Sequence, residues 1–350
     1  MSIRVNCARV PKYKGDFYRK KLLEAQLINN KFIITHNDRF LYIPLSTLPT
    51  DELLSTLPEL DIVEFDFESY PDHRSDYRSY LEVPIEVANQ LPTSFDIIGS
   101  IAIIKLPYNL LSFQQDIGSA IIKAHKNIKT VANDKGVKGN LRIRDIDVIA
   151  GELNTETIHK EYNIKLSVDV AKVYFSPRLS SEHYRISQLV KPQETILDMF
   201  AGIGPFSIMI AKYSKAERIF AIDLNSFAIK YLIRNIDQNK VTNVFPLEGD
   251  VRLMIRKIPK VNRIIMNLPM GAHEYLPEAF AVLEKIGVVH YHEIMKAEEL
   301  STKKSWLKDI AKQNRFKLIS STEHNLGSYS PTLNHYCIDL TLERLNSTGD

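Results

Sequence analysis

The chain has 350 residues, of which 44% are hydrophobic and 25% are charged, and this balance is that of an ordinary globular protein. At about 150 residues per domain, this length predicts two or three domains. The net charge of +3 permits nucleic-acid binding without arguing for it. The two cysteines, Cys7 and Cys337, lie far apart in the sequence, so we expect neither a disulfide framework nor a metal site.

The N-terminal residues mix Arg and Lys with few apolar residues, and no apolar run approaches the roughly 18 residues of a membrane span. We therefore expect no signal peptide and no membrane partner. A reducing cytoplasmic location fits the cysteine usage. Nothing in the sequence implies an obligate protein partner.

The first predicted unit is a small α+β domain over residues 1–65. Its expected elements are a helix over 16–27, strands over 32–45 with a bend near residue 37, and a short helix after Thr50. Residues 66–78 mix acidic, basic and aromatic side chains with no clear period. We interpret them as a linker.

The second predicted unit is an α+β domain over residues 79–170. Its expected elements are a strand segment over 95–107, a helix over 112–133, a strand at 141–144, and two strands over 155–161 and 164–175. The last two strands are joined at Tyr162 and Asn163, which favour a tight turn. The strand ending at 175 would place Tyr174 and Phe175 on opposite faces.

The third predicted unit, residues 171–350, alternates strands with helices. Strands are expected near 194–200, 218–223, 244–250, 263–269 and 287–294, followed by two more at 317–322 and 335–344. Sequential strand–helix repeats predict a Rossmann-like α/β domain with a parallel sheet and right-handed crossovers. The last two strands have no helix between them, so one of them should be antiparallel.

Residues 198–207, DMFAGIGPFS, connect an apolar run to an amphipathic one. A strand, a glycine turn and a helix N-terminus in that order form a nucleotide cradle, although such turns also occur for purely steric reasons. The next strand ends at Asp223, about 20 residues past the glycines, where an acid reaches ribose hydroxyls. The following strand ends lead into Asp250 and into Asn267.

The turn lacks the third glycine of the dinucleotide fingerprint, and Asp198 precedes it. A carboxylate there would repel a pyrophosphate. It would suit the cationic amino-acid end of S-adenosylmethionine, which we expect as the cofactor in preference to a nicotinamide nucleotide.

Four segments in this order resemble the archaeal-eukaryotic tRNA (guanine-37 N1)-methyltransferases: residues 95–107, 173–182 (VYFSPRLSSE), 198–207 and 267–269 (NLP). The resemblance implies that residues 1–65 bind the tRNA elbow and that residues 79–170 approach the anticodon stem. Residues 171–350 would then form a class I methyltransferase domain. The implied reaction is methyl transfer to N1 of guanosine 37 in tRNA.

The same resemblance implies roles for individual residues. Glu182 would be the general base for the N1 proton, and Arg142 would stabilise charge on O6, together with Asn267. Tyr174, Arg178 and Pro269 would shape the target pocket. Without the resemblance, Glu182 would be interpreted as a solvated carboxylate at a helix start. Arg142 and its strand neighbour Arg144 would be solvated or would contact phosphates.

For the cofactor, we expect Asp223 to accept hydrogen bonds from the ribose and Asp250 to accept one from the adenine amino group, with Val251 against the ring. A strand-end acid can instead cap the next helix, a role that Asn225 fits better than Asp223. The full predicted cofactor set is Asp198, Phe200, Gly202, Gly204, Asp223, Asp250, Val251 and Asn267.

The family often has a second arginine after the glutamate, and this chain has His183 there, with Arg185 as a candidate substitute. Binding of tRNA requires cations that contact phosphates. The candidates are Lys12, Lys14, Arg19, Lys20, Lys21, Lys123, Lys126, Lys129, Lys135 and Lys138. Two alternatives remain: an enzyme of wyosine or wybutosine synthesis that acts on position 37, and a noncatalytic RNA-binding protein.

Overall fold

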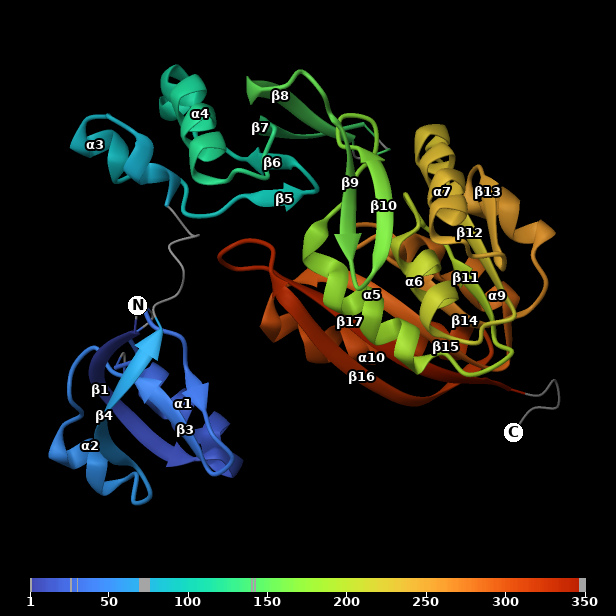
Figure 1. The fold of residues 1–350 in the computed structure, drawn as a ribbon. Helices are drawn as coiled ribbons and strands as arrows, with labels where there is room; N and C mark the ends of the chain where they lie inside the picture. The colour runs from blue at the N-terminus through green and yellow to red at the C-terminus, as the bar shows by residue number, and fades with distance from the viewer. Residues whose placement is uncertain are drawn as a thin grey trace. The chain divides into compact units, whose positions relative to one another are not determined.

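The computed structural model describes residues 2–25, 27–29, 31–68, 76–139, 141 and 143–345. The chain forms two compact units, Met1–Ser79 and Tyr80–Asp350, which are described separately (Figure 1). Among the described helices, none combines the length and apolar character that crossing a bilayer requires.

The first unit is a four-stranded antiparallel sheet in the order β2-β3-β1-β4. Its elements are β1 (Ser2–Pro11), η1 (Lys12–Lys14), α1 (Gly15–Glu24), β2 (Thr35–His36), β3 (Phe40–Pro44), α2 (Asp51–Ser55) and β4 (Asp61–Glu68). Tyr18 and Leu22 of α1 pack with Ala8, Val10 and Ile43 of the sheet. The predicted first helix, bent strands and helix after Thr50 are confirmed.

The sequence prediction missed two strands of this unit, β1 and β4. Strand β4 continues to Glu68, so the segment predicted as a linker from residue 66 begins inside the sheet. Residues 69–75 of that segment lie outside the described residues. Neighbouring residues Cys7 and Ala8 of β1 are both fully buried, because the sheet packs a hydrophobic cluster on each face, and this hides the alternation that marks a strand buried on one side.

The second unit begins with a smaller sheet in the order β5-β6-β7-β8. The short helix η2 (Tyr77–Tyr80) spans the boundary between the units. The elements that follow are α3 (Ile85–Ala88), β5 (Asp96–Ile98), β6 (Ile101–Ile104), η3 (Tyr108–Phe113), α4 (Gln114–Ala124), β7 (Thr130–Lys138) and β8 (Ile143–Gly151). The segment predicted as one strand over 95–107 is a hairpin that turns at Gly99, whose φ is +56°. The helix predicted to reach 133 ends at Ala124, because residues 130–133 are buried in β7 between β6 and β8.

The hairpin of β9 (Glu156–Glu161) and β10 (Ile164–Asp169) was predicted and is confirmed. Its turn residues Tyr162 and Asn163 have positive φ angles of 42° and 61°. Strand β10 nevertheless ends at Asp169, because that carboxylate accepts a hydrogen bond from the Ala171 N–H and forms a local turn. The prediction that a strand continues to residue 175 was therefore wrong.

The large sheet has the order β13-β12-β11-β14-β15-β17-β16. Its strands are β11 (Thr195–Asp198), β12 (Arg218–Asp223), β13 (Val244–Glu248), β14 (Val261–Met266), β15 (Leu283–Met295), β16 (Phe316–Ser328) and β17 (Asn334–Arg344). The first five are parallel and β17 is antiparallel to both of its neighbours, as predicted. This arrangement is the Rossmann-like α/β fold.

Helices cover both faces of this sheet (Figure 1). The helical segments are η4 (Pro177–Leu179), α5 (Ser180–Leu189), α6 (Pro205–Tyr213), α7 (Ser226–Asn239), α8 (Val251–Met254), η5 (Ile255–Lys257), η6 (Ala272–Tyr275), α9 (Leu276–Val282), η7 (Ala297–Glu299) and α10 (Leu300–Gln313). Consecutive strand residues enter opposite cores: Ile196 packs with α5, α6 and α7, and Leu197 packs with α9 and α10. The carboxyl ends of the parallel strands lie between these two helical layers, and the cavity described below is found there.

Candidate active site

A cavity of about 910 Å³ lies at the carboxyl ends of β11, β12, β13 and β14 and continues towards the smaller sheet of the same unit. The carboxyl ends of parallel strands meet at one edge, which is where open α/β sheets bind ligands. The predicted site residues that line the cavity are Tyr174, Arg178, Phe200, Gly202, Asp223, Asp250, Val251, Asn267 and Pro269. The sequence motifs therefore come together in one place.

The glycine turn brings the backbone to the cavity wall. Gly202 and Gly204 have φ angles of +55° and +86°, which side chains disfavour. A Cβ atom at position 204 would lie 2.2 Å from Leu232 Cδ1, whereas for one at position 202 the nearest described atom outside the turn would be the Tyr174 carbonyl oxygen, at 3.9 Å. Gly204 is thus required for packing against α7, and Gly202 leaves room for a ligand.

Asp223 ties the turn to the next strand. Its Oδ2 accepts a hydrogen bond from the Gly202 N–H at 2.7 Å, and its Oδ1 accepts one from the Asn225 N–H at 2.8 Å. Burial raises the pKa of Asp223, while these two hydrogen bonds oppose the rise. The carboxylate is therefore positioned by backbone donors before any ligand arrives.

The helix caps at this edge are Asn225 and Asp250. Asn225 Oδ1 accepts from the Phe227 N–H that begins α7, and Asp250 Oδ1 accepts from the Arg252 N–H that begins α8. The capping alternative thus describes Asn225, as predicted, and also Asp250. Both residues still line the cavity, so capping and ligand contact are compatible for them.

Asp198 lies beneath the turn. Its side chain is fully buried, its Oδ2 accepts a hydrogen bond from Ser207 Oγ at 2.8 Å, and its Oδ1 has no partner among the described residues. Burial raises its pKa to about 7. Asp198 and Gly204 are absent from the described residues that line the cavity, and what they visibly do is form the turn.

Asn267 follows β14 and, unlike Asn225 and Asp250, is distinguished by a buried side-chain oxygen that lacks a partner among the described residues. Its Oδ1 atom is buried and has no hydrogen-bond partner among the described residues, although the residue lines the cavity. Leaving a buried acceptor unpaired costs about 1–3 kcal/mol. A ligand that donates a hydrogen bond to Asn267 would recover that free energy.

Glu182 lies in the first turn of α5, and its side chain is 3% exposed. Both carboxylate oxygens accept hydrogen bonds from Arg185, at 2.6 and 2.7 Å. The interpretation of Glu182 as a solvated carboxylate is therefore wrong. Glu182 is nevertheless absent from the described residues that line the cavity.

Arg185 connects Glu182 to the last strands of the large sheet. Its Nη1 donates to Asp339 Oδ2 at 2.7 Å, and Asp339 Oδ1 lies 2.6 Å from His290 Nδ1. Burial alone would raise the pKa of Asp339, but the His290 and Arg185 interactions outweigh it and hold the pKa below its usual range. Arg185, considered as a substitute phosphate contact, is instead engaged inside the protein.

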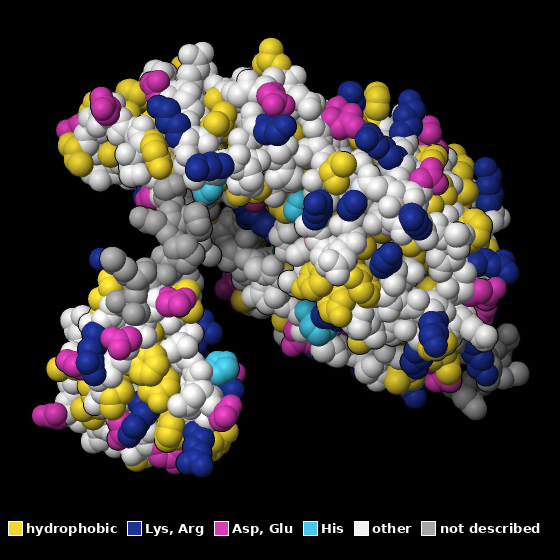
Figure 2. Space-filling model, viewed as in Figure 1, with side chains coloured by type: hydrophobic (Ala, Val, Ile, Leu, Met, Phe, Trp, Pro, Cys, Tyr) yellow, Lys and Arg dark blue, Asp and Glu magenta, His cyan; other side chains and the backbone are white. Residues whose placement is uncertain are grey.

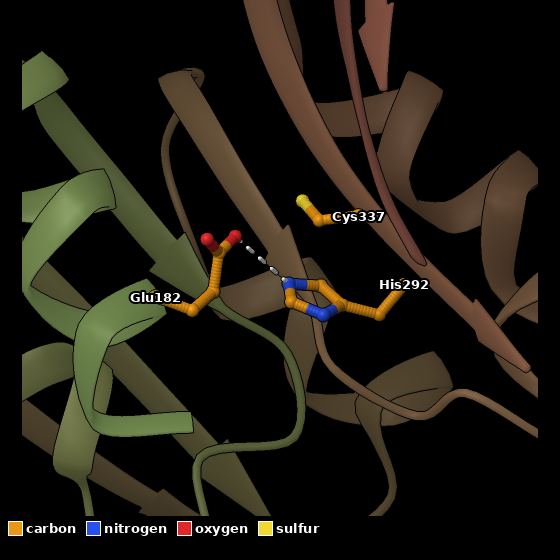
Figure 3. Close-up of side chains that lie close together, drawn as sticks. All are labelled: Glu182, His292 and Cys337. Atoms are coloured by element: carbon orange, nitrogen blue, oxygen red, sulfur yellow. Dashed lines mark ion pairs between the residues drawn. The ribbon is translucent and has the colours of Figure 1, made fainter. Parts of the chain in front are cut away.

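Figure 3 shows Glu182, His292 and Cys337 close together, a grouping that the sequence analysis did not anticipate. Their polar atoms lie within 4.8 Å of one another, because His292 of β15 and Cys337 of β17 are directly paired across the sheet. Arg185 contacts both Glu182 and, at 3.6 Å, the Cys337 sulfur. A guanidinium thus already supplies the positive charge of this grouping.

His183 stands where the family often has an arginine. Its ring is buried, and its Nδ1 lies 3.0 Å from Glu161 Oε2. The ring also packs edge-to-face against Phe206, with the two ring centroids 4.5 Å apart. The residue therefore anchors α5 to β9 while also lining the cavity.

The smaller sheet contributes Arg144 to the cavity wall. Arg144 is 9% exposed, pairs with Asp134 at 2.6 Å and lies 5.4 Å over the Tyr174 ring. The interpretation of Arg144 as a solvated residue was therefore wrong, while the alternative that it contacts a phosphate stays a prediction. Arg178 of η4 forms an ion pair at 2.8 Å with Asp96 of β5 in the smaller sheet. Arg142 lies outside the described residues, so its predicted role stays a prediction.

Sequence reasoning missed the contribution of the last two strands. His335 at the start of β17, together with the end of β16 and the first residues of the loop after it (residues 326–330), also lines the cavity. No sequence motif marks them, because they reach the site only through the antiparallel pairing of β17 with β15.

Several of the cations predicted to contact tRNA are already paired with acids. Figure 2 shows Lys and Arg interspersed with Asp and Glu on the visible face of each unit. The paired candidates are Lys14, Lys21, Lys129, Lys135 and Lys138. Exposed pairs of this kind contribute little to stability, so a phosphate can displace the acid at small cost.

Three protein-family models match successive parts of this chain. The model of the TRM5/TYW2 methyltransferase domain matches residues 157–319, that of the TYW2 N-terminal domain residues 77–155, and that of the tRNA methyltransferase 5 N-terminal domain residues 7–52. The tRNA (guanine(37)-N(1))-methyltransferase Trm5b of Pyrococcus abyssi is 44% identical over 285 residues, which cover 81% of this chain and 82% of that protein.

Solved structures of proteins from the same family resemble this structure. The crystal structure of P. abyssi Trm5b superposes with a TM-score of 0.70 at 37% identity, covering 97% of this chain and 99% of the other. The complex of aTrm5 with tRNALeu gives 0.67 at 32% identity, covering 97% and 99%. Methanocaldococcus jannaschii TYW2 in complex with AdoMet gives 0.57 at 30%, covering 72% and 100%. With its cavity at the class I glycine turn, this chain belongs to the TRM5/TYW2 family of tRNA methyltransferases.

Proposed function

We propose that this protein transfers the methyl group of S-adenosylmethionine to N1 of guanosine 37 in tRNA. The observation that carries the proposal is the unpaired, buried Asn267 oxygen on the wall of a cavity that also presents Asp223 and the open glycine turn. A guanine edge or the cofactor's ammonium would supply the missing donor. Similarity to Trm5b of P. abyssi supports the choice of reaction.

The cofactor fits the glycine-turn end of the cavity. Asp223 would accept hydrogen bonds from the ribose and Asp250 would accept one from the adenine amino group, with Val251 against the ring. The Gly202 backbone leaves space for close approach, because among the described residues beyond the turn only the Tyr174 carbonyl lies within 4 Å of the position that a Cβ would take there. S-adenosylmethionine supplies an electrophilic methyl group when it is bound.

The chemistry requires removal of the proton on guanine N1 and stabilisation of the charge that then grows on O6. We assign the first task to Glu182 and the second to Arg142, with Asn267, Tyr174, Arg178 and Pro269 holding the base. Guanosine 37 must leave its stack in the anticodon loop to enter the cavity.

A tRNA transcript with adenosine in place of guanosine 37 is expected to accept no labelled methyl group, because adenine N1 carries no proton and position 6 carries no oxygen. Mass spectrometry of the wild-type product should locate the methyl group on N1 of nucleotide 37. Equal incorporation into both transcripts would refute the assignment, and no incorporation into either would favour a noncatalytic RNA-binding role.

An enzyme of wyosine synthesis that acts on position 37 remains the second candidate, because residues 77–155 match the TYW2 N-terminal domain. The match of residues 7–52 to the methyltransferase 5 N-terminal domain favours N1 methylation. The two are separated by the mass of the modified nucleoside.

We also propose that residues 1–65 dock on the tRNA elbow and that residues 79–170 approach the anticodon stem, joined by residues 66–78, with residues 171–350 as the catalytic domain. In the structure, the compact unit Met1–Ser79 contributes none of the described residues that line the cavity.

Deletion of residues 1–79 is therefore expected to leave the dissociation constant for S-adenosylmethionine unchanged in calorimetry. It should lower kcat/KM for full-length tRNA far more than for an anticodon stem-loop, which lacks an elbow. Equal losses on the two substrates would contradict the docking role.

A further inference from the structure

Glu182 does not reach the cavity, yet a line of side chains leads from the cavity to it. His335 lines the cavity, and its Nε2 atom lies 3.2 Å from Nδ1 of His292. The other ring nitrogen of His292, Nε2, lies 4.0 Å from Glu182 Oε1 (Figure 3). His292 is fully buried, and its Nε2 atom has no hydrogen-bond partner among the described residues.

Both rings are held neutral by their surroundings. Burial lowers the pKa of His335 to about 4, against the opposing charge of Glu182. Burial, followed by the neighbouring His335 and His290, lowers the pKa of His292 well below its usual value, while Asp339 opposes and Arg185 reinforces the shift. A neutral imidazole carries one N–H and one free lone pair, which is the state needed to pass a proton from one nitrogen to the other.

We propose that His335 and His292 form a relay that carries the N1 proton of the bound guanine to Glu182. This inference rests on the proposed function. Because Nε2 of His335 faces His292, Nδ1 is the nitrogen left for the guanine. The relay accounts for a general base that is buried behind the cavity wall.

The N1–H bond breaks, its proton passes to His335 Nδ1, and its electron pair forms the bond from N1 to the methyl carbon. The carbon–sulfur electrons remain on the departing sulfur. The Nε2 proton of His335 moves to His292 Nδ1, and the Nε2 proton of His292 moves to Glu182 Oε1. Both histidines end neutral with their tautomers exchanged. After the tRNA leaves, the same transfers run in reverse and pass the proton from Glu182 through His292 to His335 Nδ1, which releases it to solvent in the cavity and restores the carboxylate and both tautomers.

The surrounding charges permit Glu182 to accept the proton. Arg185 also binds Asp339, through Nη1 at 2.7 Å and Nη2 at 3.2 Å, so it keeps a carboxylate partner when Glu182 becomes neutral. The 4.0 Å separation of His292 and Glu182 exceeds a hydrogen bond. A side-chain movement of about 1 Å closes it to the usual 2.7–3.2 Å.

The test is chemical rescue. Replacing His335 by Gly should lower the single-turnover methyl-transfer rate by about 10²-fold or more, the scale of a lost acid–base group. Free imidazole should restore much of that rate, because the variant leaves a ring-sized space at the cavity wall. His292→Phe should be equally slow and should resist rescue, because position 292 is sealed from the cavity. His273→Gly, at an exposed histidine outside the cavity wall, is the matched control and should behave as wild type.

Imidazole should not accelerate the wild-type enzyme or Glu182→Gln. In mixtures of light and heavy water, the wild-type rate should curve with deuterium content, since more than one proton is in flight. A wild-type rate in His335→Gly, or a slow variant without rescue together with a linear deuterium dependence, would overturn the relay. If His335→Gly fails to bind S-adenosylmethionine, the deuterium dependence of the wild type alone decides. All of these rates presuppose wild-type N1 methylation, and its absence would refute the proposed function instead.

Discussion

Glu182→Gln is expected to lower the single-turnover rate of methyl transfer by about 10²–10⁴-fold, the usual loss when a general base is removed. Glutamine keeps the shape of the side chain and can still accept from Arg185, but its amide cannot take up a proton. The dissociation constants for S-adenosylmethionine and tRNA should change little, because Glu182 does not line the cavity. Rapid-quench kinetics at saturating enzyme measures the chemical step directly.

Glu194→Gln is the matched control. Glu194 pairs with Arg263 at 2.7 Å, and the two side chains are 13% and 4% exposed, so this variant also weakens a buried ion pair. The control should methylate at the wild-type rate, because neither residue is among the described residues that line the cavity. A full rate in Glu182→Gln would mean that electrostatic stabilisation by Arg142 and Asn267 suffices. Equal losses in both variants would show that weakened packing is responsible.

Arg185→Met is expected to lower the free energy of unfolding by about 3–5 kcal/mol, the range for removing one partner of a buried ion pair. The substitution leaves Glu182 and Asp339, which are 3% and 16% exposed, without their shared cation. Urea denaturation followed by circular dichroism measures the loss. Arg218→Met is the control: its pair with Glu217 is about half exposed on both sides, and its loss should cost about 0–1 kcal/mol.

The pH dependence of stability provides a second measurement on the same cluster. A carboxyl whose pKa is held down in the folded state stabilises the fold above the pKa of the unfolded chain, and that stabilisation is lost as the pH falls. Asp339 is such a group, from a usual value of 3.8. The wild type should therefore lose stability more steeply than Arg185→Met as the pH falls below about 4. Parallel curves would show that Arg185 does not hold down the Asp339 pKa.

The parts of the site that could be predicted from sequence are those built from consecutive residues. The turn at Gly202 and the strand end at Asp223 have fixed chemistry and spacing, and the alternation of strands and helices determines that they meet at one sheet edge. The resemblance added Glu182, which the residue pattern alone would have left on the surface.

The parts that escaped prediction depend on pairing between distant segments. His335 and Asp339 come from a strand inserted beside β15, and no local pattern announces that neighbour. Arg144 was expected to be solvated or to contact a phosphate. Its burial could not be predicted, because it depends on contacts with Asp134 and with the Tyr174 ring. The helix expected to reach residue 133 was wrong for the same reason, since β6 and β8 take residues 130–133 into a sheet.

Because β17 lies between β15 and β16, the active site can be completed only after the last strand of the sheet has been translated. His335, Cys337 and Asp339 alternate along β17, so a slip of one residue against β15 would turn all three to the opposite face. The nascent chain emerges with its glycine turn long before these residues are translated. A polypeptide released before residue 339 therefore lacks the carboxylate that shares Arg185 with Glu182, so premature termination leaves the active site without its charge balance.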